Sequence, residues 1–65
     1  MPRIGEFKRE LQKAGCYLTG HGGRHDDWYS PITGQSFQIP RHDGEELPKW
    51  LETRLRKIAG VPKKR

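Results

Sequence analysis

The chain has 65 residues, 31% hydrophobic and 32% charged, and 13 lysines and arginines against 8 acids give it a net charge of +5. This length excludes a second large domain and predicts a thin core, because a domain of about 60 residues buries only about 60% of its unfolded surface. Apolar runs of at most three residues exclude a membrane span, and the positive charge favours nucleic acid or an acidic protein as the partner.

The first ten residues and the cysteine count predict a cytoplasmic protein. The opening MPRIGEFKRE lacks the apolar segment of a signal peptide. The single cysteine, Cys16, rules out an internal disulfide framework and suits a reducing compartment. We therefore expect an intracellular protein.

Residues 4–15 predict the first helix. Its apolar residues recur at spacings of three and four and form one stripe, which comprises Ile4, Phe7, Leu11 and Ala14. Gly15 follows as the expected residue that ends the helix. Residues 16–19, CYLT, then predict a short strand with Cys16 and Leu18 on one face.

A loop and a β-hairpin follow this strand. Residues 20–23, GHGG, predict the loop, and residues 24–30 predict the second strand. Residues 31–34, PITG, predict a tight turn, which leads into a third strand at residues 35–40.

The alternation of side chains assigns the faces of the hairpin. Phe37 and Ile39 share the inward face of the third strand, and Trp28 is the better core candidate in the second. The residues on the open face are then His25, Asp27 and Tyr29. A register slip of one residue would reverse this assignment.

Residues 47–60 predict the second helix. Pro48 suits its first turn and Gly60 its end. Its apolar stripe comprises Leu47, Leu51, Leu55 and Ile58. Residues 1–60 then form one domain, and residues 61–65 form a basic tail. The predicted fold is α+β in the order α-β-β-β-α, a three-stranded antiparallel sheet with both helices on one face.

The stretch GGRH at residues 22–25 is a candidate for chemistry on an anion. Gly22 and Gly23 let the backbone approach a phosphate closely and leave N–H groups to donate to it. Arg24 adds a fixed cation, and His25 adds an imidazole, a group that titrates near neutrality. The same residues also fit a flexible loop followed by an ordinary surface histidine.

The acids and the other histidines give weaker signals. Asp27 can orient the ring of His25, although Asp26 and Asp27 also fit two solvated acids. Neighbouring strand residues point to opposite faces, so these carboxylates do not share an ion. Structural zinc sites usually show paired ligands at short spacing, which one cysteine and three histidines do not give here. We expect no metal and no cofactor.

Basic residues occur outside this stretch as well. Arg41 and His42 follow the third strand at the rim of the sheet, where they contact a phosphate or form a polar loop. The cations of the helices fit solvated faces, but their number supports an electrostatic contribution to RNA binding. They are Lys8, Arg9 and Lys13 in the first helix and Arg54, Arg56 and Lys57 in the second.

Four segments together resemble the HicA family of toxin mRNA interferases. They are LQKAGCYLTG, GGRH, PITGQSFQIPRH and the KIAG that ends the second helix, and the resemblance covers residues 7–60. It implies the double-stranded-RNA-binding-like fold and an endoribonuclease that cleaves mRNA without ribosome or metal. His25 takes the position of the family's catalytic histidine. The chain departs from the family at two positions. Family members often have an apolar residue at the position of Asp27 and a glycine at the position of Trp50.

The resemblance also implies the partners, which are an mRNA substrate and a HicB-type antitoxin that neutralises the toxin. RNA supplies its own 2′-hydroxyl nucleophile, so His25 is needed as general acid or base. The candidate RNA contacts are Gly22, Gly23, Arg24, Tyr29, Arg41 and His42. A non-catalytic RNA-binding module is the alternative, and a basic protein-interaction module is a third interpretation. The sequence is compatible with a homodimer or a hetero-oligomer with the antitoxin.

Overall fold

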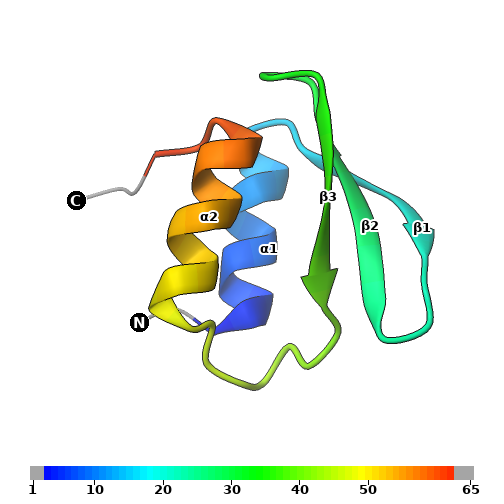
Figure 1. Cartoon of the computed structure of the whole chain (residues 1–65), viewed down its shortest axis with the longest axis vertical. Helices are drawn as coiled ribbons and strands as arrows, with labels where there is room; N and C mark the ends of the chain where they lie inside the picture. The colour runs from blue at the N-terminus through cyan, green and yellow to red at the C-terminus, as the bar shows by residue number, and fades with distance from the viewer. Residues whose placement is uncertain (1–2, 63–65) are drawn as a thin grey trace.

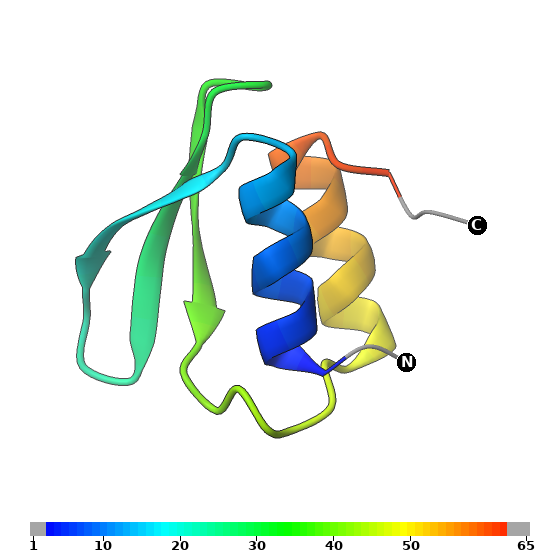
Figure 2. The same cartoon turned by 180° about the vertical axis from the view of Figure 1, so that it is seen from behind.

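The computed structural model describes residues 3–62 (Figure 1). Its elements are α1 (Ile4–Lys13), β1 (Tyr17–His21), β2 (His25–Ser30), β3 (Gln35–Pro40) and α2 (Lys49–Ala59). The strands form one antiparallel sheet in the order β1-β2-β3, and both helices lie on one face of it (Figures 1 and 2). The predicted fold class is confirmed. Residues 63–65 of the predicted basic tail lie outside the described residues.

Helix α1 has the predicted apolar stripe, except at its end. Ile4, Phe7 and Leu11 are buried, whereas Ala14 is exposed. The reason is that the helix ends at Lys13 and Gly15 turns the chain away with a φ of +108°, a conformation that favours glycine. The expectation that Ala14 belongs to the core stripe was therefore wrong.

Helix α2 begins one residue after Pro48 and ends at Gly60, whose φ is +73°. Leu55 is buried, and Leu51 and Ile58 are half-buried against the core. Leu47 is fully buried but precedes the helix, so it anchors the entry to α2 rather than its first turn. Val61, just after the helix and assigned to the tail by the sequence prediction, is also buried, as is Ala59.

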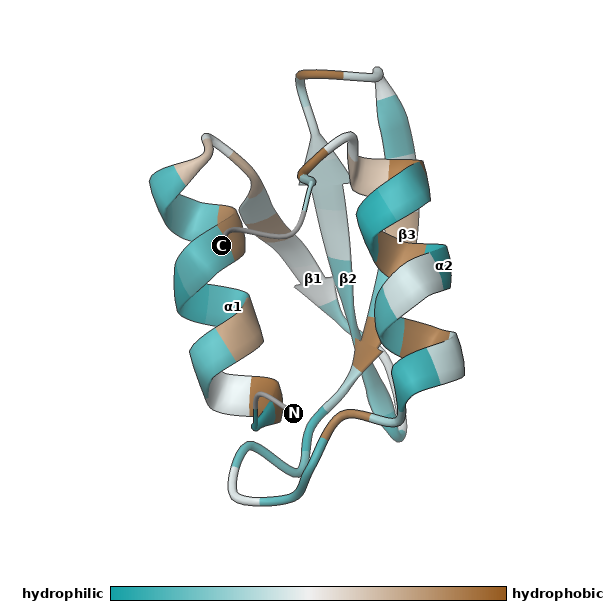
Figure 3. Ribbon diagram, turned by 90° about the vertical axis from the view of Figure 1, so that its left-hand side faces the viewer, coloured by the Kyte–Doolittle hydropathy of each residue, from teal (hydrophilic) through white to brown (hydrophobic). Residues whose placement is uncertain are grey.

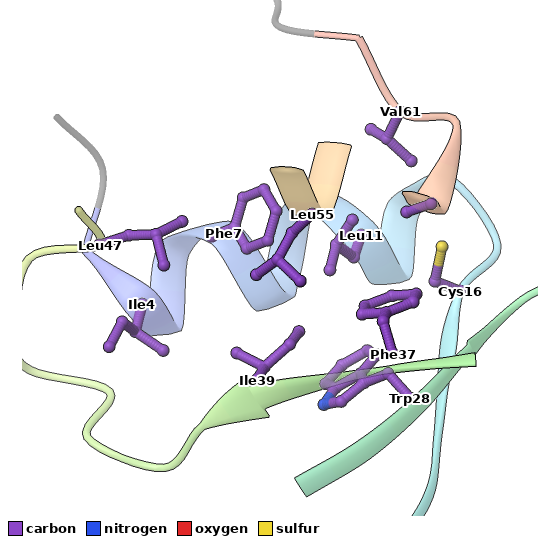
Figure 4. Packing of buried hydrophobic residues seen from close by; sticks show 11 residues of the cluster. Ile4, Phe7, Leu11, Cys16, Trp28, Phe37, Ile39, Leu47, Leu55 and Val61 are labelled. Atoms are coloured by element: carbon purple, nitrogen blue, oxygen red, sulfur yellow. The ribbon is translucent and has the colours of Figure 1, made fainter. Parts of the chain in front are cut away.

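The core lies between the two helices and the sheet. Figure 3 shows the hydrophobic segments of α1 and α2 turned toward each other and toward the sheet. Trp28 pairs with Phe37 across β2 and β3, and both are buried, so the predicted inward faces of the hairpin are confirmed. Figure 4 shows Phe37 and Ile39 beneath the side chains of Phe7 and Leu55.

Strand β1 differs from its prediction. It begins at Tyr17, continues through Gly20 and His21, and contains a register irregularity between Leu18 and Gly20. Cys16 is buried as expected, but Leu18 is 40% exposed. Strand β1 forms the edge of the sheet that lies away from α2 (Figure 1). The loop is correspondingly shorter than predicted and spans residues 22–24.

Two of the basic helix residues are structural, contrary to the expectation of a solvated face. Arg56 joins α2 to α1 through Glu10 (2.6 Å), pairs with Glu52 of its own helix (2.8 Å) and lies over the ring of Phe7. The hydrogen bonds with Glu10 and, after it, Glu52 raise the pKa of Arg56. The side chain of Lys8 is only 12% exposed and pairs with acids from the sheet and from the loop after β3.

The β2–β3 turn is attached to the end of α2. The hydroxyl of Ser30 donates to the carbonyl of Ala59 at 2.6 Å, and that of Thr33 donates to the carbonyl of Ile58 at 2.7 Å. These carbonyls lie in the last turn of a helix, where no intrahelical partner remains. The two bonds therefore fix α2 against the hairpin. Over residues 3–62, neither helix is long and apolar enough to cross a membrane.

Candidate active site

His25 lies at the start of β2, where it pairs with Pro40 at the end of β3. Its side chain is exposed and belongs to the sheet face that the helices leave open, because Asp26, Trp28 and Ser30 take the inner face. The predicted grouping of His25, Asp27 and Tyr29 on one face is confirmed by the same alternation.

A groove runs from His25 to α2, and we call it the His25 groove. It is lined by His25, Gln38 and Pro40 from the sheet and by Trp50, Leu51 and Arg54 from α2. The groove exists because β3 is an edge strand of the sheet and α2 packs against it (Figure 1). An imidazole, a guanidinium and an indole thus share one concave surface.

One backbone N–H of the 22–24 loop, which joins β1 and β2, already forms a hydrogen bond within the protein. The N–H of Gly22 donates to the carbonyl of His25 at 2.8 Å, so it is not available to a phosphate, contrary to expectation. A Cβ at Gly22 would lie 2.9 Å from the same oxygen, whereas a Cβ at Gly23 would meet no atom within 4 Å. Gly22 is required by this close approach, and Gly23 and Arg24 remain on the exposed side of the loop.

Asp26, expected to be a solvated acid, is the centre of a charged cluster behind His25. It is 9% exposed, forms hydrogen bonds with His21 Nδ1 and Arg41 Nε, both at 2.9 Å, and lies 3.6 Å from the Lys8 ammonium. The bond with His21 and, after it, that with Arg41 hold the pKa of Asp26 below its ordinary value, although burial opposes them. This cluster connects α1, β1, β2 and the loop after β3.

Arg41 therefore has a structural role in addition to any contact with RNA. It binds Asp26 and also donates to the carbonyl of Gly22, so it ties the 22–24 loop to the end of β3. His42 is exposed in the following loop, and its carbonyl accepts a hydrogen bond from the N–H of Glu45.

The other predicted site residues lie on the open face. Asp27 accepts a hydrogen bond from Gln38 Nε2 at 3.2 Å, so its observed partner is an amide and not the ring of His25. Tyr29 is half-buried and contacts Tyr17, with 5.6 Å between the ring centroids. Within residues 3–62, no three histidine, cysteine, aspartate or glutamate side chains converge to form a metal site.

Sequence reasoning did not assign Trp50 and Arg54 to the site. Trp50 is 67% exposed. The sequence did contain a signal for Trp50. The apolar stripe of this helix does not include it, so burial in the core does not explain an indole at this position. Its place beside His25, however, depends on how α2 packs against β3, which no local pattern reveals.

A family model described as "HicA toxin of bacterial toxin-antitoxin" matches residues 4–61. This match includes both helices and all three strands. No curated protein and no solved structure matches the chain.

Proposed function

Because the chain belongs to the HicA family of bacterial toxin–antitoxin toxins, we propose that it is an endoribonuclease that cleaves mRNA with His25 as its catalytic residue. It acts without the ribosome and without a metal ion. The reaction takes place in the cytoplasm, where the substrate is found.

The position of His25 is the observation that carries this proposal. Its imidazole is exposed on the open face of the sheet and lines a groove that also contains a guanidinium from α2. A phosphodiester backbone is attracted to such a surface by charge, and it can reach the ring without any rearrangement of the core. The family match supports the proposal independently, because it identifies the chain as a member of a toxin family.

The proposed reaction uses the nucleophile that RNA carries. The 2′-oxygen forms a bond to the adjacent phosphorus, and the bond from phosphorus to the 5′-oxygen of the next nucleotide breaks. The 2′-hydroxyl loses a proton and the 5′-oxygen gains one, so the products are a 2′,3′-cyclic phosphate and a 5′-hydroxyl. His25 performs one of these proton transfers, as base or as acid, and water completes the other. Such a group typically contributes about 10²–10⁴-fold to the rate.

The reacting phosphate gains negative charge, which nearby cations and N–H donors stabilise. We propose that Arg24 and the backbone of Gly23 supply part of this stabilisation, because they lie on the exposed part of the loop before His25. Tyr29, Arg41 and His42 extend the proposed RNA surface along the open face and the rim. Gly22 contributes only by its lack of a side chain, because its N–H already donates to the carbonyl of His25. Asp27 lies on the open face with His25 and accepts a hydrogen bond from Gln38. We propose that it helps to orient the ring of His25.

The proposed protein partner is a HicB-type antitoxin. A protein that silences this enzyme must keep RNA from His25, and acidic groups would complement the basic residues around the groove. The product of an open reading frame beside the gene is the first protein to test. Co-expression should yield a complex with the toxin, as a hetero-oligomer, that has lost ribonuclease activity.

Induction in a bacterial host tests the proposed function. The parental protein should arrest growth and deplete mRNA, and His25→Ala should restore growth at equal protein levels. Circular dichroism of the purified variant should show an intact fold, because His25 is exposed and contributes little to the core. Growth arrest that persists undiminished in the variant would contradict the assignment of His25. A protein that binds RNA and leaves mRNA intact would be a binding module instead.

A further inference from the structure

Trp50 is the most exposed large hydrophobic side chain among residues 3–62. It is 67% exposed, compared with 53% for Ile32, 51% for Tyr17 and 40% for Leu18. Exposure of an indole leaves a large apolar surface in water, and exposed aromatic groups on otherwise polar surfaces often mark binding sites.

The backbone that carries Trp50 is part of a closed helical turn, in which the N–H of Glu52 donates to the carbonyl of Pro48 at 2.8 Å. Trp50 lies in the first turn of α2, between the buried Leu47 and the buried Leu55. The far end of the helix is fixed by the hydroxyls of Ser30 and Thr33. Because a rigid element carries the indole, little backbone entropy is lost when a ligand contacts it.

The groove that Trp50 lines contains the guanidinium of Arg54 and, among residues 3–62, no acidic side chain. Residues 49–59 contain one acid, Glu52, and it is buried beside Arg56. The described ion pairs of α2 use Arg56, whereas Lys49, Arg54 and Lys57 are exposed. Arg54 is one helical turn from Trp50 and lines the same groove. The surface therefore attracts an anion that also has an apolar, planar part.

Single-stranded RNA has these two properties. Its bases stack on aromatic side chains when they are not paired, and its phosphates bind arginine and lysine. We propose that Trp50 is a stacking platform for a base next to the scissile phosphate, and that Arg54 binds a neighbouring phosphate. This inference rests on the proposed function, because it assigns the RNA substrate of His25 to the groove that His25 and Trp50 line together.

The proposal predicts that the substrate is unpaired where it is cut. A base held in a duplex is stacked on its neighbours and cannot present its face to an indole, so a helical segment would have to open first. A short single strand should accordingly compete for the protein better than a duplex of the same sequence.

Tryptophan fluorescence offers a direct test, because the chain has two tryptophans and Trp28 is only 3% exposed. The His25→Ala protein, which the proposal makes non-cleaving, is titrated with random-sequence single-stranded RNA of about ten nucleotides. Stacking on Trp50 should quench its emission. Trp50→Ala in the same background should weaken binding about tenfold or more, and Trp50→Phe should weaken it less.

The matched control is Ile32→Ala, which removes another exposed apolar side chain on the β2–β3 turn, at the opposite end of β3 from His25. It should leave RNA affinity and quenching unchanged, and thermal unfolding should show that all variants are folded. Equal RNA affinity of the His25→Ala protein with and without Trp50→Ala would overturn the proposal. So would loss of binding to the co-expressed antitoxin with RNA affinity intact, because the platform would then belong to a protein partner.

The same measurements distinguish a failure of the stacking platform from a failure of the proposed nuclease function. Quenching by RNA together with an absence of cleavage by the protein that retains His25 would refute the nuclease and leave the stacking platform standing. Cleavage that is lost in His25→Ala and unaffected by Trp50→Ala, with no quenching, would support the nuclease and refute the platform.

Discussion

At position 22, the carbonyl oxygen of His25 occupies the space where a side chain would begin. The distance from a Cβ there to this oxygen would be 2.9 Å, closer than such atoms approach in proteins. The Gly22 N–H donates to the same oxygen. Gly22, the first residue of the 22–24 loop, is thus constrained by the backbone of His25, whose ring we place in the reaction.

Gly22→Ala should therefore displace the start of β2. We expect it to lower the free energy of unfolding by about 1–3 kcal/mol, as overpacking does elsewhere. Gly23→Ala is the matched control, because its Cβ would meet nothing within 4 Å and its φ is not positive. It should stay within about 0.5 kcal/mol of the parent in urea denaturation. Equal losses for the two variants would contradict the proposed constraint.

Asp26 illustrates what the sequence could and could not reveal at this scale. Strand alternation places it on the inner face with Trp28, so its burial was predictable from the pattern that correctly placed His25 outside. Its partners were not predictable, because Lys8, His21 and Arg41 come from α1, β1 and the loop after β3. Only the packed fold brings a lysine, a histidine and an arginine to one carboxylate.

Asp26→Asn should destabilise the protein at about pH 5, and the destabilisation should shrink progressively as the pH falls below about 4. The folded-state pKa of Asp26 is below its ordinary value, so its contribution is present above the unfolded pKa of about 4 and is lost as the pH falls through the folded value. Urea denaturation of both proteins at several pH values measures this difference. A gap that stays constant down to the lowest pH would show that the charge of Asp26 contributes nothing.

At the scale of the elements, the two helices and the hairpin follow from local patterns, and β1 does not. Period-two alternation and the Pro31–Gly34 turn predict β2 and β3 correctly. The irregularity between Leu18 and Gly20 breaks the alternation in β1 and carries the strand through Gly20, a residue type that normally indicates a loop. Pairing with β2, rather than local preference, determines that strand.

The attachment of the hairpin to α2 gives a prediction at this scale. Ser30→Ala removes the donor to the carbonyl of Ala59, which remains buried without that partner. We expect a loss of about 1–3 kcal/mol in the free energy of unfolding. Ser36→Ala changes an exposed serine of β3 and should cost less than about 0.5 kcal/mol. Similar values for both variants would mean that the bond to α2 is unimportant for stability.

For the whole molecule, the fold divides the cations into two groups. Lys8, Arg41 and Arg56 bind acids within the protein, whereas Arg24 and Arg54 are exposed near His25. Composition alone gives the net charge and not this division. The His25 groove is likewise a property of the assembled molecule, since it forms where an edge strand meets α2.

The cleavage of RNA by purified protein in the presence of EDTA tests the central claim most directly. Parental protein and His25→Ala are incubated with the same RNA, and fragments ending in a 2′,3′-cyclic phosphate are quantified. We predict such fragments from the parental protein and a rate at least about 10²-fold lower from the variant, which should still bind RNA. Cleavage by the folded variant at the parental rate would contradict the account.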